Sequence, residues 1–231
     1  MPEDTVFYID DVCIPHTWFP VEDGINNIVV FKANNINRVA TVAAGNYSVL
    51  NLGLAIVIAM NAAAGVDYFE SLYDLRVNSL TLKLKTTYSA IPFEIYTDHF
   101  VQEIAPTYAK KTMNNLLKNF TSKGYNTNPF VSGYVDLYPL RNIYMTSSGL
   151  GNFNTMTVTG ERNVIKKIPV NTGHGDVIFD QTVTGMDYLD CSRQTLSRVS
   201  FQLRDIFGNI IPLHGNHISF SIVFSRIQNG S

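Results

Sequence analysis

The chain has 231 residues, of which 45% are hydrophobic and 16% are charged, and its formal net charge is −2 at pH 7. Because a charged share of about 25% is usual, this surface is short of charge and suits a protein that buries much of itself against neighbours. The 17 Lys and Arg residues are scattered without forming a basic stripe, which argues against direct nucleic-acid binding. The length allows a full core, and one domain over residues 1–231 is expected.

The start of the chain, Met1 to Thr5, lacks the basic and apolar stretches of a secretory signal. The longest apolar run, Val49 to Ala64, is interrupted by polar residues and is shorter than the roughly 20 residues that a membrane span needs. It predicts a buried helix and no membrane span. Cys13 and Cys191 lie far apart, and each is expected to be a small buried hydrophobe rather than half of a disulfide.

Most of the sequence consists of short β-rich runs separated by turn residues. Apolar and polar residues alternate in Leu80 to Lys85 and in Ile218 to Ser225, as in sandwich strands with one face on a core. The residues from Asp205 to Asn209 are expected to turn the chain between the last two strands. The predicted strands are Val6 to Ile14, Ile28 to Lys32, Val77 to Lys85, Phe93 to Tyr96, Asn142 to Thr146, Met156 to Thr159, Val164 to Pro169, Val177 to Gln181, Arg198 to Leu203 and His217 to Arg226.

Two helices are expected between these strands. The first begins near Ser48, a suitable N-cap residue, and ends at about Ala64, with Gly65 as the stop signal. It is apolar nearly all round, so we expect it to be packed on several sides. The second, about Tyr108 to Asn119, has the pattern of a surface helix. Because no regular β-α-β alternation appears, the sequence favours an all-β sandwich or jelly roll over a doubly wound fold.

Residues that could carry chemistry do not form a recognisable constellation. His214 and His217 are spaced i, i+3 at a turn, but no cysteine or acidic residue adjoins them, so no metal site is expected. Asp10 and Asp11 are neighbours on a strand, where they would point to opposite faces and could not act as an acid–base pair. We read them as belonging to an edge or turn of that strand.

Two further patterns resemble parts of catalytic or nucleotide-binding motifs. Asp98-His99 has no Gly-x-Ser-x-Gly elbow to serve, and Thr97 or Asp98 is expected to cap a short helical turn. The glycine pairs at 149–151 and 173–175 neither precede a helical pattern nor continue into a Walker-type Lys-Ser/Thr. Aromatic residues make up 12% of the chain and more often fill cores than bind ligands. We therefore expect no enzymatic activity, no metal and no cofactor.

Several stretches, read in order, resemble motifs of the penton-like minor capsid proteins of polintons, adintoviruses and related double-stranded DNA viruses and virophages. Ile9 to Phe19 resembles the first strand and its Pro-x-Thr/Ser-Trp-Tyr turn, and Gly45 to Ser48 resembles the Gly-x-Tyr entry to a helix. The shared order over nearly the whole chain carries the resemblance. The other stretches are Phe93 to Asp98, Ser132 to Leu137, Arg141 to Ser148, Val164 to Val170, Leu203 to Asn209 and Gly215 to Phe220.

This resemblance implies an all-β fold, a single jelly-roll β-sandwich over residues 1–231 with one or two helical insertions. It implies a structural virion protein, a minor capsid or penton subunit that self-assembles in rings of about five at capsid vertices and contacts the major capsid protein. The expected location is the capsid of a virion assembled inside the host cell. Trp18 and Phe19 are expected to anchor the first turn, Gly45 the helix entry and Gly208 the last turn.

The sequence also bears on two other functions. The aromatic residues and Asn-rich loops would also suit a jelly-roll carbohydrate- or receptor-binding module. A jelly-roll enzyme of the cupin type would need His and Glu ligands spaced along adjacent strands, and the strands lack a His-x-His pattern.

Overall fold

The structure is a computed structural model that describes residues 3–138, 140–150, 164–185, 187–193, 195–196 and 198–226. The chain folds into two compact units, one formed by Met1–Trp18 with Leu140–Ser231 and the other by Phe19–Pro139. The second unit is thus inserted into the first along the sequence. The expectation of one domain over residues 1–231 did not anticipate this division. The predicted strand from Met156 to Thr159 lies outside the described residues.

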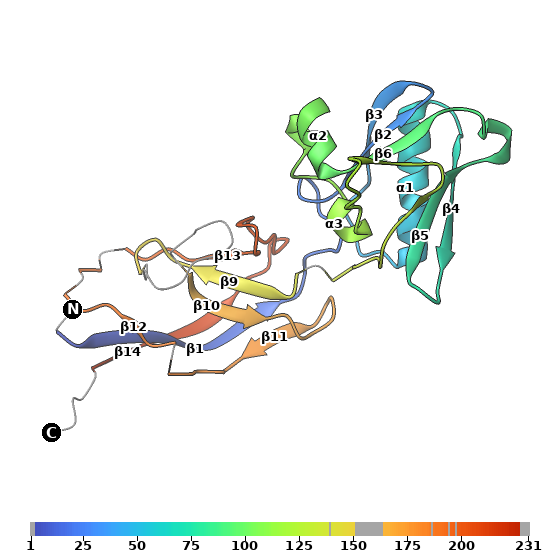
Figure 1. Ribbon diagram of the computed structural model, residues 1–231. Helices are drawn as coiled ribbons and strands as arrows, with labels where there is room; N and C mark the ends of the chain where they lie inside the picture. Colours follow the sequence, from blue (N-terminus) through green and yellow to red (C-terminus); the bar gives the residue numbers. More distant parts are fainter. Residues whose placement is uncertain are drawn as a thin grey trace. The chain divides into compact units, whose positions relative to one another are not determined.

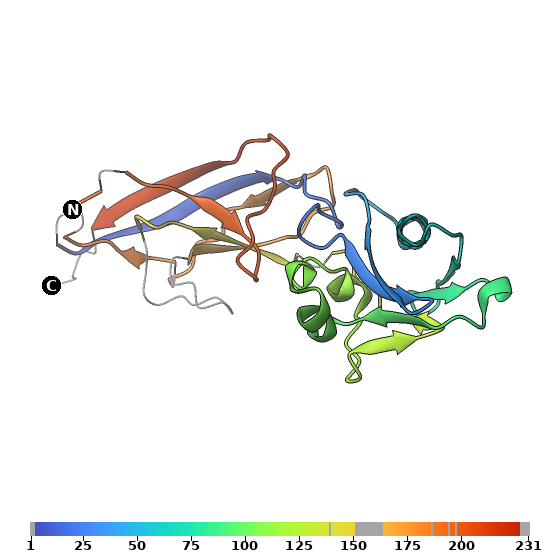
Figure 2. The ribbon, with the colours of Figure 1, turned by 90° about the horizontal axis from the view of Figure 1, so that it is seen from above.

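The first sheet of the first unit is built around its longest strand, β1 (Thr5–Pro15). One edge of β1 pairs with β14 (Ser219–Arg226), and the other edge pairs with β11 (Val177–Asp180) and β12 (Leu189–Asp190). All of these pairings are antiparallel, and Figure 2 shows β1 and β14 running side by side. The two ends of the chain therefore meet in one sheet.

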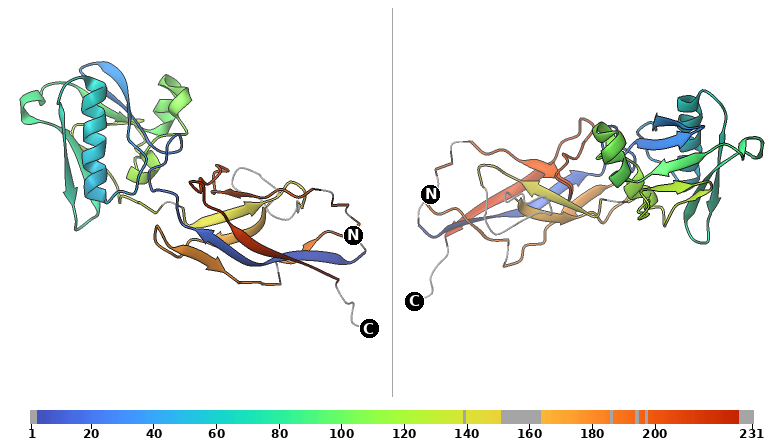
Figure 3. Two further views of the ribbon diagram at one scale, coloured as in Figure 1. Left: turned by 180° about the vertical axis from the view of Figure 1, so that it is seen from behind. Right: turned by 45° about the horizontal axis from the view of Figure 1, so that its top comes forward.

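The second sheet of this unit has the strand order β10–β9–β13. Its strands are β9 (Asn142–Thr146), β10 (Val164–Pro169) and β13 (Gln202–Arg204), all antiparallel (Figures 1 and 3). Side chains from both sheets form one apolar core, which completes a sandwich. The core includes Phe7, Ile9, Val12, Ile14, Ile143, Met145, Ile165, Ile168, Ile178, Leu189 and Leu203.

A β-bulge in the middle of β1 keeps both halves of the strand on the core. The register against β14 shifts between Ile9 and Asp11, so Asp10 has no partner residue on β14. In a regular strand with a period of two, Ile9 and Val12 would point to opposite faces. The extra residue corrects this, and both side chains are buried. Asp10 and Asp11 therefore form a bulge, not the edge or turn that we expected.

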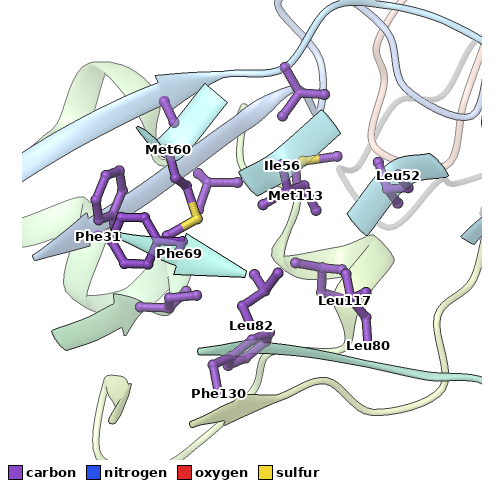
Figure 4. Packing of buried hydrophobic residues seen from close by; sticks show 14 of the residues in the cluster. Phe31, Leu52, Ile56, Met60, Phe69, Leu80, Leu82, Met113, Leu117 and Phe130 are labelled. Atoms are coloured by element: carbon purple, nitrogen blue, oxygen red, sulfur yellow. The ribbon is translucent and has the colours of Figure 1, made fainter. Parts of the chain in front are cut away.

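The second unit contains two more antiparallel sheets and all of the helices that the structure describes. One sheet has the order β3–β2–β6–β7, with β2 (Ile28–Ala33), β3 (Ile36–Thr41), β6 (Phe93–Tyr96) and β7 (Tyr125–Thr127). The other has the order β4–β5–β8, with β4 (Phe69–Asp74), β5 (Ser79–Leu84) and β8 (Phe130–Val131). Leu80, Leu82 and Leu84 are buried, as the alternation predicted. They join the core that Figure 4 shows, with Phe31, Ile56, Met60 and Phe69.

Helix α1 (Val49–Ala64) has the predicted ends. The Ser48 side chain accepts a hydrogen bond from the Asn51 N–H, and Gly65 stops the helix in the left-handed conformation at φ 69°. The prediction that the helix is packed on several sides was wrong. One face packs on the core, whereas Leu54 and Ile58 are 51% and 69% exposed.

The predicted second helix, Tyr108 to Asn119, was wrong as a continuous element. The structure has α2 (Asp98–Ile104), short 3-10 turns at Thr86–Tyr88 and Pro106–Tyr108, and one turn of helix, α3 (Asn114–Leu117). The backbone of Ile28 donates to the Lys111 carbonyl and accepts from the Met113 N–H, at 3.0 and 2.8 Å. This pairing with β2 uses backbone groups that a helix would need, so the helix cannot pass through this point.

The architecture as a whole is a mostly β, jelly-roll-like sandwich with few helices, in agreement with the predicted fold class. The predicted bounds of β6, β9 and β10 match the structure residue for residue. The last turn also lies where it was expected: the Asp205 carboxylate accepts from the N–H groups of Phe207 and Asn209, both at 2.8 Å. Gly208 in this turn has φ 85°, the left-handed region that a β-branched residue avoids.

We expect Gly208→Val to lower the free energy of unfolding by about 1–2 kcal/mol, because valine is strained at this φ. Urea unfolding followed by the fluorescence of Trp18, the single tryptophan, measures this in the first unit. Gly185→Val is the matched control, since an added Cβ meets nothing within 4 Å there. Equal midpoints for the two variants would show that the Gly208 turn tolerates a side chain.

Candidate functional site

The end of β1 and the loop between β10 and β11 form a small aromatic cluster in the first unit. The His16 N–H donates to the Asp176 carbonyl and the Gly175 N–H donates to the His16 carbonyl, both at 2.8 Å. The His16 ring stacks on Trp18, with the ring centres 4.2 Å apart. The ring of His174 meets that of His16 edge-on at 6.0 Å. Both His16 and Trp18 are buried.

Backbone carbonyls orient the two imidazoles. Nδ1 of His16 lies 3.0 Å from the Thr172 carbonyl oxygen, and Nδ1 of His174 lies 3.2 Å from the Trp18 carbonyl oxygen. Since a carbonyl can only accept, each neutral ring carries its proton on Nδ1. Burial lowers the pKa of His16 and the neighbouring His174 also lowers it, whereas the bond to Thr172 and the charge of Asp176 raise it. The net direction is down, so His16 favours the neutral form.

A buried lysine connects the two sheets of the sandwich. Lys166 lies on β10, and its side chain is 3% exposed. Its Nζ donates to the carbonyl oxygens of Ile9 on β1, at 3.1 Å, and of Thr182, at 2.9 Å. It also forms an ion pair with Asp180 of β11, at 3.4 Å. The ammonium group thus has two carbonyl acceptors and one ion-pair partner, which together compensate a buried charge.

Irregularities in two strands build this lysine site. The register of β10 against β9 shifts between Val164 and Lys166, and Val164, Ile165 and Lys166 are all buried. The shift in β1 comes directly after Ile9, whose carbonyl accepts from Lys166. This site was not predicted from the sequence. The signal was present, because in a strand with a period of two Lys166 shares a face with Val164 and Ile168.

Of the four residues predicted as structural anchors, two lie in the first unit. Trp18 is in its core, in the aromatic cluster, and Gly208 is in the turn after β13. The other two, Phe19 and Gly45, lie in the second unit. The Phe19 N–H donates to the carboxylate of Glu22 at 2.6 Å.

Gly45 precedes α1 at the predicted helix entry. Its N–H donates to the Val21 carbonyl at 2.9 Å, and an added Cβ would lie 3.3 Å from the Tyr47 ring. The four anchors therefore do not form one site, and their importance stays a prediction.

The other residues considered for catalysis or metal binding are Asp98 and the two histidines His214 and His217. Asp98 is the first residue of α2. Its carboxylate accepts hydrogen bonds from the Asn114 side chain, at 2.7 Å, and from the Thr112 hydroxyl. His214 and His217 are exposed, and in the described part of the chain no group of three or more His, Cys, Asp and Glu could hold a metal ion.

The predicted burial of the two cysteines holds for only one of them. Cys13 and Cys191 are free thiols; Cys191 is buried as predicted, whereas Cys13 is only half-buried. Burial raises the pKa of the Cys191 thiol. Among the described helices, none is long and apolar enough to cross a membrane.

The paired sheets define a protein of the jelly-roll-like sandwich class. No family model matches the sequence, and no curated protein matches it. Among solved structures, the chain is similar to the penton protein of mavirus, with a TM-score of 0.51 and 11% sequence identity. The similarity covers 98% of this chain and 87% of that one. At this identity it shows a shared fold, and it extends over both units.

We expect Lys166→Met to lower the free energy of unfolding by about 3–5 kcal/mol, because Asp180 would stay buried without its partner. Trp18 fluorescence during urea unfolding provides the measurement. Lys167→Met, the exposed neighbour, is the control and should change stability by less than about 0.5 kcal/mol. Similar losses for both variants would mean that the buried ion pair contributes little.

His16 should make stability depend on pH. Because its pKa is lowered on folding, the unfolded state binds more protons below about pH 6.5. Its contribution is complete above that pH and declines as the pH falls. Replacing His16 by Asn should therefore flatten the fall in unfolding free energy from pH 7.5 to pH 5.5. An undiminished fall in unfolding free energy in His16→Asn would contradict the assignment.

Proposed function

We propose that this protein is a structural subunit of a viral capsid, of the minor capsid or penton type. The observation that carries the proposal is the similarity to the mavirus penton protein, which covers 98% of this chain. A similarity confined to the sandwich would be weaker support, because β-sandwich folds serve many functions. Here the similarity includes the inserted unit as well.

Composition and local structure support a function by assembly. Only 16% of the residues are charged, so the surface suits burial against neighbouring subunits. In the first unit, His16 takes part in ring stacking and Lys166 in ion pairing. In this proposal the protein is not an enzyme and uses no cofactor; it associates with copies of itself at capsid vertices, and it contacts the major capsid protein. It resides in the virion after assembly in the host cell.

A second function has one specific observation in its favour. Tyr134 and Tyr138 lie close together in the sequence of the second unit and are 64% and 65% exposed. Exposed tyrosines suit sugar or receptor binding, because the ring is apolar and its hydroxyl is polar. A glycan array would support the binding module only if the hits disappear in Tyr134→Ala/Tyr138→Ala.

We expect the purified chain to associate into a closed ring of about five copies. Light scattering over a concentration series should give a mass about five times the 25.8 kDa of one chain. Co-expression with the candidate major capsid protein, followed by purification of particles, tests the vertex location. A chain that stays monomeric at every concentration and never co-purifies with particles would contradict the proposal.

A further inference from the structure

The outer face of the β1 sheet carries unpaired acidic groups beside aromatic side chains. Asp10 is exposed and Asp11 half-buried at the bulge, and neither forms an ion pair with any described residue. On the same strand, Tyr8 packs against Tyr188, with ring centres 4.9 Å apart. Phe179 of β11 is 54% exposed and points outward, because its neighbours in the strand are buried. Apolar side chains and negative charge are thus exposed together.

The outer face of the β9 sheet carries the opposite charge. Lys167 and Arg204 both pair with Tyr144, from the two sides of β9, so the three residues form one row across the sheet. The row faces outward, because the neighbours of Tyr144 in the strand, Ile143 and Met145, are fully buried. Lys167 is exposed and forms no ion pair within the part of the chain that the structure describes.

Apolar groups accompany this basic row as well. Phe207 and Ile210, in the turn that follows Arg204, are 59% and 58% exposed. The Arg204 guanidinium donates to the Gly208 carbonyl at 2.8 Å, so the turn and the row are fixed to each other. The two outer faces of one sandwich are therefore similar in apolar character and opposite in charge. Each has the composition expected of an interface core with a charged rim.

We propose that the outer face of the β1 sheet of one copy binds the outer face of the β9 sheet of a second copy, with Asp10 and Asp11 opposite Lys167. The inference rests on the proposed function and names the surfaces through which the subunit would associate. A two-fold contact between identical faces would bring Asp10 and Asp11 against their own counterparts, which like charges disfavour. A contact between unlike faces is head to tail, and such contacts close into rings when the rotation allows.

Charge reversal tests this pairing. The variants are Asp10→Lys/Asp11→Lys, Lys167→Glu and the triple variant that combines them, each compared with the wild type by light scattering and sedimentation. The two partial variants place like charges across the contact, so each should associate more than about tenfold more weakly. The triple variant restores opposite charges with their signs exchanged and should regain the wild-type mass.

Controls separate loss of contact from loss of fold. Lys123→Glu, at an exposed position of the second unit, should keep the wild-type mass. Trp18 fluorescence reports whether the sandwich of each variant is folded. If Asp10→Lys/Asp11→Lys does not fold, Asp10→Asn/Asp11→Asn takes its place. It removes the negative charge with little change in shape and should also weaken association.

Each outcome has a distinct meaning. An oligomeric wild type whose partial variants keep their mass would overturn the inference and leave the proposed function standing, with assembly through another face. Folded partial and triple variants that are all monomeric would also overturn it, because the sign of the charge would then not matter. A wild type that is monomeric at every concentration would overturn both the inference and self-assembly.

Discussion

The ammonium group of Lys166 sets the conditions that the rest of the sandwich has to meet. A charge at this depth is tolerated only where it is compensated. Here a carbonyl of β1 and the Thr182 carbonyl accept hydrogen bonds, and Asp180 of β11 supplies the opposite charge. One side chain of β10 thereby connects the second sheet to two neighbouring strands of the first. A sliding of either sheet would separate Nζ from its partners, so the polar contact specifies one alignment of the apolar core.

The strand irregularities that serve this lysine also shape the surface. The bulge in β1 comes directly after the carbonyl that Lys166 binds, and its extra residue is one of the two adjacent aspartates. In β10, Lys166 is buried whereas the next residue, Lys167, is exposed. The inner ion pair and the outer charges are therefore two results of the same local geometry. Bulges are often retained in proteins because they redirect side chains in this way.

Local patterns in the sequence were sufficient for many elements and insufficient where distant segments meet. Strand bounds at Asn142–Thr146 and Val164–Pro169, and both ends of α1, follow from alternation and capping residues that need no tertiary information. The helix expected from Tyr108 to Asn119 failed because the backbone near Thr112 pairs with β2, more than 80 positions earlier in the chain. β4 (Phe69–Asp74) was missed because polar residues interrupt its apolar pattern.

The candidate site was predictable only in part, for the same reason. Trp18 was predicted as an anchor, and its stacking partner His16 is a near neighbour in the sequence. The contacts of His174 with the His16 ring and with the Trp18 carbonyl, however, join positions 156 or more apart. The prediction for Asp10 and Asp11 assumed a regular strand. The bulge depends on the pairing of β1 with β14, which lies at a distant position in the sequence. The division into two units likewise depends on contacts between both ends of the chain.

The pairing of β1 with β14 also orders events during synthesis. The ribosome makes β1 first and β14 last, and residues 19–139 emerge between them and form a unit of their own. The β1 sheet can therefore be completed only after β14 has been translated, whereas the inserted unit can fold earlier. The outer face of the β1 sheet is completed in that step. A nascent chain consequently has no complete β1 face to offer a neighbour until β14 has been made.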